Sequence, residues 1–425
     1  MSRLTRALRH RNYRLFFSGQ SVSLVGTWIT RVATSWLVYR LTGSEWLLGL
    51  VGFCGQIPTM LLAPFAGVIV DRTPRHRVLV VTQLLSLLQS LTLALLTLDG
   101  TITVAWLLVL QIAQGIINAF DTPARQAFVV EMVEDRADLP NAIALNSAMV
   151  NGSRVIGPSI GGALIAAVGE GWCFMADAVS YVFVVASLLM MRVPRAPVRT
   201  VEARMREELR DGWHYVRQSV PIRTALIVLA IVSTMAMPYT VLMPAFVDHV
   251  IHGGPNTLGV LMAATGIGAL AGGMYLAGRQ SVVGLGRVVM VSTLVFGAAL
   301  IAFAFAGSLR IAVAVLPIVG GAFMVQMAAT NTVLQTLVDD RLRGRVMAFY
   351  TMAFFGTAPI GSLLAGILAD RIGARWTIAA GGAIVIAAGL WFAARLPALR
   401  AIVRPIYVER GILPVPAVDA GTKTL

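Results

Sequence analysis

The sequence GVIVDRTPRHR, at residues 67–77, is a short basic stretch between two long apolar segments. Its glycine, Gly67, permits close approach of two helices, and its aspartate, Asp71, suits a charged partner or a helix end. The arginines Arg72, Arg75 and Arg77 suit the anionic headgroups of a lipid bilayer. The stretch therefore predicts a tight loop at a membrane surface.

The apolar segments on either side belong to a chain built mostly of such segments. Of 425 residues, 57% are hydrophobic and only 13% are charged, which is typical of an integral membrane protein. A helix needs about 20 apolar residues to cross a bilayer. We expect an all-α protein with twelve spans, near residues 14–40, 46–70, 77–98, 103–122, 142–168, 173–192, 222–247, 257–278, 287–307, 310–333, 346–368 and 376–394.

The net charge of +14 could suggest a nucleic-acid partner, but the basic residues are distributed by loop. Most of the 34 lysines and arginines fall in one alternate set of connections between spans. The opposite set contains only Arg40, Arg310, Arg371 and Arg375. Positive loops stay in the cytoplasm, so both termini are predicted there and the nucleic-acid interpretation is rejected. We expect a multi-pass protein of the cytoplasmic (inner) membrane, present as a monomer.

One long polar connection divides the spans into two sets of six. We expect a six-helix bundle at residues 1–192, a linker at 193–221, a second bundle at 222–396 and a cytoplasmic tail at 397–425. Met205, Leu209, Trp213 and Val216 recur at helical spacing in the linker and predict an amphipathic helix on the membrane surface. A solvated charged linker is the alternative.

The two halves resemble each other. Residues 107–136 can be aligned with residues 312–341. This alignment matches Gly115 with Gly320 and VEDR at 133–136 with VDDR at 338–341. A parallel repeat of six-span bundles indicates a two-domain transporter with its site between the halves. Chance similarity between apolar helices is the weaker explanation, because the acidic loop is shared.

Polar residues at helical spacing predict faces that line a wet cavity or a helix interface. From the N-terminal half, the cavity candidates are Gln20, Thr27, Arg31, Gln111, Gln114, Asn118 and Arg154. From the C-terminal half, they are Ser233, Met237, Tyr239, Gln326 and Thr330.

Ionisable residues inside the spans are few, and each costs at least about 2.5 kcal/mol at mid-depth. Arg31 and Asp177 lie at similar depths, so they are expected to form a structural ion pair or a proton-linked site. Arg154 has no acidic partner at its depth, so it is expected to contact an anionic substrate or helix-end carbonyls. Asp121 could pair with Arg125 one turn away, or either could reach the loop of Asp71.

Together these features resemble the major facilitator superfamily. The stretch at 67–77 is similar to its loop motif, with Pro74 where a glycine is usual, whereas the counterpart near residues 277–287 is degraded. Gly157, Pro158, Gly161 and Gly162 look like the motif of the antiporter branch. GTWITRVATSWLVYRLTGS at 26–44, NAFDTPARQAFV at 118–129 and GILADRIGAR at 366–375 are similar to the enterobactin exporter group.

The resemblance implies a gating latch in which Asp71 engages Arg125 and the region of Gly344 and Arg345, stabilising an outward-open state. It also implies that the glycines and proline of the antiporter motif pack the fifth span against the other half. Proton-coupled exporters carry an arginine where this chain has Gln111, so a coupled proton would fall to Asp121 or Asp177. The alternative is that the charge of the substrate itself drives exchange.

We therefore expect a secondary exporter of a small, partly apolar molecule such as a siderophore or drug, with protons as the driving ion. Uptake and a nontransporting receptor or scaffold are the alternatives. No cofactor or metal is expected. The two cysteines and the absence of HExxH and GxSxG motifs argue against a metal centre and an intramembrane enzyme, and no ATP-binding loop is present.

Overall fold

The computed structural model describes residues 3–133, 135–192, 205–279, 281–339 and 341–414. Within these residues every regular element is a helix, as the sequence predicts. Nine of their helical stretches are long and apolar enough to cross a membrane. With α1 and α5 added, and with the last stretch divided at Gly373, they are compatible with the twelve expected spans.

The N-terminal bundle has six long helices. Helix α1 packs against α5 and α6, α2 packs against α4, and α3 packs against both α4 and α6. Two of its helices start at hydroxyl caps, where Ser44 accepts from the Leu47 amide and Thr103 from the Trp106 amide. The helices are α1 (Arg11–Thr42), α2 (Glu45–Asp71), α3 (Arg75–Leu98), α4 (Val104–Glu131), α5 (Leu139–Val168) and α6 (Glu170–Leu189).

The C-terminal bundle repeats this plan with more interruptions. Helix α11 packs against α12 and α14, and α10 packs against α12. Helix α7 (Met205–Gln218) lies ahead of the bundle, within the predicted linker, and residues 193–204 fall outside the described chain. The bundle contains α8 (Val220–Ile231), α9 (Tyr239–Phe246), α10 (Pro255–Ala277), α11 (Leu285–Ala304), α12 (Leu309–Leu337), α13 (Arg343–Thr351) and α14 (Ala358–Glu409).

The predicted seventh and eleventh spans are each broken by π-helical turns. These turns are η3 (Val232–Ala236) and η4 (Val247–Ile251) around α9, and η5 (Met352–Gly356) between α13 and α14. A π turn leaves backbone groups without their usual helical partners. The Ser233 hydroxyl donates to the Phe354 carbonyl, so it joins two of these turns across the bundle.

Helix α14 continues past the predicted end of the last span. Gly373 has a φ of 82°, a left-handed conformation that turns the chain between the eleventh and twelfth spans. The helix then runs without a break to Glu409, so residues 397–409 are helical although they lack an apolar run. The predicted domain limits at residues 192, 221 and 396 remain predictions.

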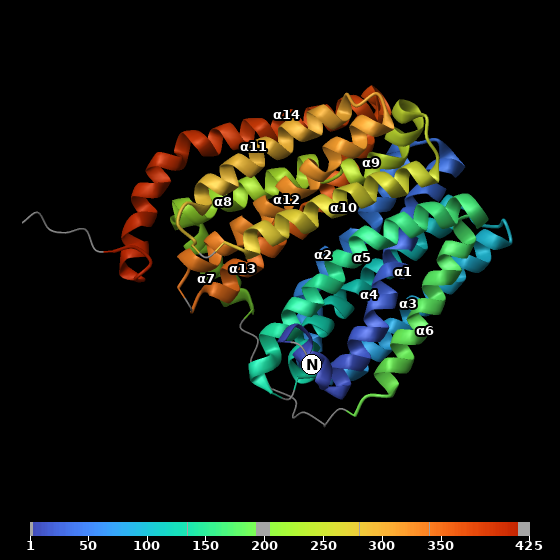
Figure 1. Cartoon of the computed structure of the whole chain (residues 1–425), viewed down its shortest axis with the longest axis horizontal. Coiled ribbons are helices and arrows are strands. Elements are labelled where there is room, and N and C mark those ends of the chain that lie inside the picture. The colour runs from blue at the N-terminus through green and yellow to red at the C-terminus, as the bar shows by residue number, and fades with distance from the viewer. Residues whose placement is uncertain (1–2, 134, 193–204, 280, 340, 415–425) are drawn as a thin grey trace, which may run out of the picture.

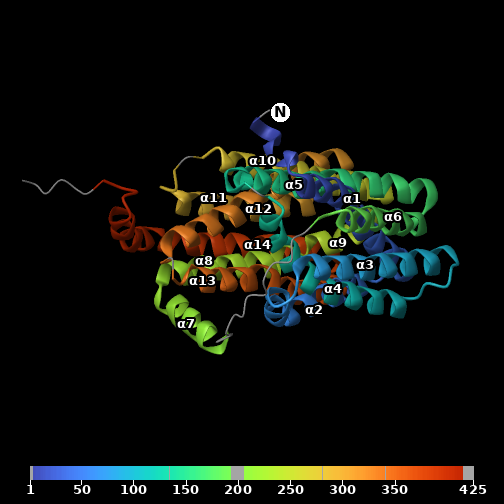
Figure 2. The ribbon, with the colours of Figure 1, turned by 90° about the horizontal axis from the view of Figure 1, so that it is seen from below.

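The two bundles meet at one end of the molecule and diverge at the other. We call the end where α2 finishes and α3 begins the motif end, and the end where α1 finishes and α2 begins the far end. Figure 1 shows the bundles converging near α9, at the far end, and separating toward α7 and the N-terminus. Figure 2 shows α7 set apart from the long helices, beside α8 and α13.

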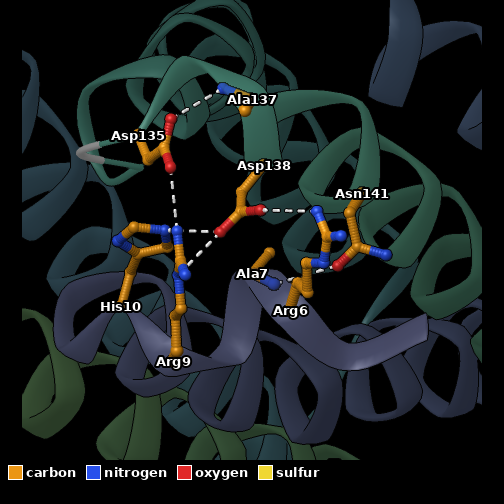
Figure 3. Close-up of polar contacts among 8 residues, drawn as sticks. All are labelled: Arg6, Ala7, Arg9, His10, Asp135, Ala137, Asp138 and Asn141. Atoms are coloured by element: carbon orange, nitrogen blue, oxygen red, sulfur yellow. Dashed lines mark hydrogen bonds and ion pairs between the residues drawn. The ribbon is translucent and has the colours of Figure 1, made fainter. Parts of the chain in front are cut away.

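At the motif end, ionic contacts fasten the N-terminal segment to the loop before α5. Asp138, only 2% exposed, accepts from Arg9 Nε at 2.8 Å and lies 3.1 Å from His10 Nε2 (Figure 3). Asp135 accepts from Arg9 Nη2 at 2.9 Å and from the Ala137 amide at 3.0 Å. These donors, the Ala137 amide first, hold the pKa of Asp135 below its usual value.

The repeat-related loop at 338–341 performs a parallel task. Arg410, at the end of α14, lies 3.2 Å from an Asp339 carboxylate oxygen and donates to the Thr336 carbonyl at 2.8 Å. Each acidic loop of the repeat therefore ties down the terminal segment of its own bundle.

Candidate functional site

The far end is closed by backbone contact between glycines of opposite bundles. A Cβ added to Gly49 of α2 would lie 2.7 Å from the Gly366 Cα of α14, and one added to Gly366 would lie 2.8 Å from the Gly49 Cα. A second pair of glycines, between α5 and α10, makes the same kind of contact. A Cβ on Gly162 of α5 would lie 2.8 Å from the Gly259 Cα of α10. Only residues without side chains allow helices to approach so closely.

A polar network joins the bundles beside these glycines. The Tyr39 hydroxyl of α1 lies 3.2 Å from Asp248 Oδ2 and 3.0 Å from His249 Nε2, both in η4. Glu45, 6% exposed, lies 3.7 Å from His249 Nδ1 and accepts from the Ala374 amide at 3.3 Å. The first turn of α2 is thereby bonded to both the seventh and the twelfth spans.

The motif end lacks comparable contacts among the described residues. A Cβ added to Gly67 or Gly344 would meet no heavy atom within 4 Å in the chain that the structure describes. The expectation that Gly67 permits close helix approach is therefore wrong for this conformation. The physical reason is the divergence of the bundles, which leaves the end of α2 facing open space.

The basic loop makes its ionic contacts within the N-terminal bundle. Asp71 lies 3.3 Å from Arg75 Nη2, and Arg75 Nη1 lies 2.6 Å from Glu131 at the end of α4. Arg72, an exposed residue, caps the end of α2. Asp71 is 51% exposed in its side chain, and Arg125 pairs with Asp121 at 3.5 Å instead. The latch contacts expected of Asp71 are not formed in this conformation.

The other expected latch partner is engaged by α7. Arg345 Nη1 of α13 lies 3.1 Å from Asp211 Oδ2 of α7. The rings of Trp213 and Phe349 lie 6.0 Å apart in the same contact. The linker helix is thus bonded to the start of the eleventh span, where the latch would form.

The glycine and proline motif of α5 faces two neighbours. Gly157 packs on the Trp28 side chain and Gly161 on Ile29, so both serve contact with α1 in the same bundle. Gly162 contacts α10 of the other bundle, and a Cβ on Gly259 would lie 2.6 Å from the Pro158 carbonyl oxygen. Gly162 and the Pro158 carbonyl therefore pack against the other half, whereas Gly157 and Gly161 pack within their own bundle.

Two arginines share one tryptophan ring between the bundles. The Cζ atoms of Arg31 and Arg154 lie 4.6 Å and 5.5 Å from the centroid of Trp28. The Arg154 Nε is buried and has no hydrogen-bond partner in the described chain. Arg154 also interacts electrostatically with Tyr239 of α9, so the cluster reaches the C-terminal bundle.

The expected ion pair between Arg31 and Asp177 is wrong. Asp177 accepts hydrogen bonds from the hydroxyls of Thr30 and Ser90, each at 2.9 Å, and from Ser180 at 3.4 Å. Thr30 precedes Arg31, and successive helical residues point about 100° apart. Because Thr30 faces Asp177, Arg31 faces away from it toward Trp28.

Asp121, the other candidate for proton coupling, is also buried in the N-terminal bundle. It accepts from Thr82 Oγ1 at 3.0 Å and from Gln83 Nε2 at 2.7 Å, in addition to its pair with Arg125. Both acids therefore sit among hydrogen-bond donors, but only Asp121 has a cation within 4.0 Å in the described residues.

The remaining cavity candidates of the N-terminal half form contacts inside their own bundle. Gln114 Nε2 donates to Ser86 at 3.3 Å and to Asn118 Oδ1 at 3.2 Å. Gln111 lies against Gly55 of α2, and the Thr27 hydroxyl donates to the Ser23 carbonyl at 3.0 Å. Gln20 is buried, whereas Asn118 is exposed.

Most cavity candidates of the C-terminal half are enclosed. Ser233, Gln326 and Thr330 are fully buried and Tyr239 is nearly so, while Met237 is half-buried. Ser233 bonds the Phe354 carbonyl, and Gln326 donates to Thr330 at 3.4 Å. In this conformation Ser233, Gln326 and Thr330 bond within their own bundle, whereas Tyr239 also interacts with Arg154 of the N-terminal bundle.

Several residues at the site escape prediction from the sequence. Trp28 is read as one more apolar residue of a span, Glu131 and His249 as loop or flanking residues, and Asp211 as a charged residue of the linker helix. Only spacing offers a signal for Trp28: it precedes Arg31 by three residues, so the two side chains are neighbours on a helix.

Residues 4–412 match the family of transmembrane secretion effectors in the major facilitator superfamily. The chain belongs to this family. Its relatives include the staphyloferrin A transporter of Staphylococcus aureus (strain NCTC 8325 / PS 47), 28% identical over 85% of this chain and 90% of that protein. The multidrug efflux pump Tap of Mycolicibacterium fortuitum is 29% identical over 84% and 88%. The secretion effector is thus a membrane transporter and not an enzyme.

Solved structures share its fold. A bacterial homologue of the iron transporter ferroportin has a TM-score of 0.69 and 17% identity, covering 90% of this chain and 98% of that one. A POT family transporter has a TM-score of 0.74 and 12% identity over 92% and 96%. The predicted fold, two six-helix bundles of the major facilitator type, is confirmed.

The glycine contact at the far end yields a stability prediction. Gly162→Ala should lower the thermal unfolding temperature of the transporter in detergent, because overpacking against Gly259 costs about 1–3 kcal/mol. Gly152→Ala is the matched control in the same helix. Its Cβ meets no atom within 4 Å, so the temperature should hold or rise. Equal effects of the two substitutions would refute the far-end contact.

Proposed function

We propose that this secretion effector is a proton-driven exporter of the cytoplasmic membrane that works by rocking of its two bundles. The observation that carries the proposal is the one-sided closure around the arginine pair. Glycine contacts and the Tyr39–His249 network close the far end, while the motif end is splayed. A central site reached from one end at a time is the requirement of alternating access.

The distribution of basic residues supports a cytoplasmic position for the motif end. Arg72, Arg75 and Arg77 lie there, together with the basic N-terminal segment and α7. The far end carries few basic residues, among them Arg40, which is bound to Glu170 at 2.8 Å. By the positive-inside rule, the splayed end opens to the cytoplasm and both termini lie there.

The relatives support export of a small molecule. One is named for transport of staphyloferrin A and another for multidrug efflux. We therefore propose a partly apolar small molecule, such as a siderophore or drug, as the cargo of this chain.

Asp177 is the better candidate for the coupled proton. The charge of Asp121 is balanced by Arg125, whereas no cation lies within 4.0 Å of Asp177 in the described residues. A buried carboxylate that lacks a cation readily takes up a proton. Its donors come from α1, α3 and α6, so protonation would act on the packing of three helices.

We further propose that the basic loop is a latch with two alternating partners at Arg345. With the motif end open, Asp211 of α7 holds Arg345. With the motif end closed, Asp71 would leave Arg75 and engage Arg125 and the region of Gly344 and Arg345. The monomer is proposed to be the working unit, because each bundle supplies its own half of the site.

Transport direction tests the function. Inverted vesicles containing the transporter should accumulate ethidium or carboxyfluorescein only when a pH gradient, acidic inside, is imposed. Asp177→Asn should abolish the dependence on the gradient, because a carboxamide cannot bind the proton, whereas Asp99→Asn at an exposed far-end position should not. Accumulation only in right-side-out vesicles would establish uptake, and binding without movement in either would establish a receptor.

The latch is tested by a pair of substitutions. Asp71→Asn should lower the transport rate about tenfold, equivalent to about 1.4 kcal/mol in the barrier, while ligand binding is retained. Asp211→Asn removes a carboxylate from the same arginine in the splayed state alone, so transport should persist. Equal loss of binding and transport in Asp71→Asn would contradict a gating role.

A further inference from the structure

Arg31 and Arg154 form a cationic cluster at the middle of their helices. Arg31 belongs to α1 (Arg11–Thr42) and Arg154 to α5 (Leu139–Val168), and each is far from both ends. Their guanidinium groups lie over one Trp28 ring, at 4.6 Å and 5.5 Å from its centroid. Two positive charges are thus held together at a depth where single charges are costly.

The cluster lies at the boundary between the bundles. Trp28 precedes Tyr39 by about three helical turns, so both lie on the face of α1 that meets the C-terminal bundle. From the other side, a Cβ on Gly266 of α10 would lie 2.9 Å from the Arg154 carbonyl oxygen. Arg31 follows Trp28 by three residues, so it lies on the same side of α1, and its side chain is exposed.

The protein supplies no anion to balance the cluster within the described chain. No carboxylate lies within 4.0 Å of either guanidinium, and three buried acids of the N-terminal bundle are bonded elsewhere. Asp177 accepts from hydroxyls, Glu45 contacts His249 and Ala374, and Glu170 binds Arg40. The buried Arg154 Nε is left without an acceptor.

We propose that the transported molecule carries an anionic group, such as a carboxylate, that binds between Arg31 and Arg154. A guanidinium pair with free N–H groups matches the geometry of carboxylate oxygens. The Trp28 ring beside both arginines suits the apolar part of the same molecule. This inference rests on the proposed function for its substrate and names the chemical class that the site would select.

Binding of an anionic dye tests the site. With the full chain in nanodiscs of phosphatidylcholine, carboxyfluorescein should bind, and added salt should weaken it. Naphthoate should displace the dye, whereas naphthamide, which has the same ring without the charge, should not. This comparison uses the unaltered protein. Failure of the wild type to bind the dye, or equal displacement by both compounds, would overturn the proposal.

Substitutions locate the binding to the cluster. Arg31→Gln and Arg154→Gln should each weaken dye binding at least about tenfold, and Arg31→Lys should weaken it less because charge is kept. Arg395→Gln is the matched control. Arg395 stacks on Trp391 at 4.5 Å in α14, outside the cluster, so its loss should leave binding unchanged. Dye binding by both glutamine variants at the wild-type level would overturn the assignment.

Two further comparisons distinguish lipid binding from substrate binding, and failure of the anion site from failure of the proposed export. Nanodiscs that include phosphatidylglycerol should bind the dye as before, and loss of dye binding there would assign the arginines to lipid headgroups instead. Gradient-driven transport of ethidium without anion binding would defeat this inference and leave the exporter intact. Anion binding without any gradient-driven transport would defeat the proposed function and leave the anion site intact.

Discussion

Close contact between glycine backbones of opposite bundles is the constraint on which this structure depends. Gly49 meets Gly366 and Gly162 meets Gly259, at equivalent places in the two halves of the repeat. Lipid provides no hydrophobic drive to hold helices together, so association rests on such packing and on polar bonds. Here the bonds are those of Tyr39 and Glu45 to η4. Because both kinds of contact occur at the far end, that end is closed in this conformation while the motif end is splayed.

Unpaired charges are costly in the low dielectric of a membrane protein's interior, and the ionisable residues of the N-terminal bundle fall into two groups. Asp177, Asp121 and Glu170 are each satisfied inside the N-terminal bundle, by hydroxyls, by amide and guanidinium groups, and by Arg40. Arg31 and Arg154 are different, because they share an aromatic ring and no described carboxylate. Charge without a protein partner at the bundle boundary is what a substrate site needs. The structure thus separates charges that are balanced inside the bundle from two cations that no described carboxylate balances.

Apolar run length and basic-loop asymmetry were enough to predict the helical bundles, because span length follows directly from bilayer thickness. Pairings across space were harder. Arg31 and Asp177 have matching depths, yet their side chains diverge because Thr30 occupies the direction of Asp177. The polar residues Gln326 and Thr330 resemble a cavity stripe but bond to each other in a closed interior. Depth and periodicity can be read from a sequence, whereas the rotation of one helix against another depends on contacts such as Gly157 on Trp28.

Distances between spin labels at both ends of the working transporter test the alternate opening of the two ends most directly. In a chain whose Cys54 and Cys173 are replaced, one label pair would occupy Thr101 and Gly307 at the far end and another Arg77 and Arg287 at the motif end. Under a pH gradient in proteoliposomes, the far-end distance should lengthen in the population whose motif-end distance shortens. A far-end distance that stays constant while transport proceeds, or two distances that change in the same sense, would contradict alternating access in which the glycine contacts of the far end separate.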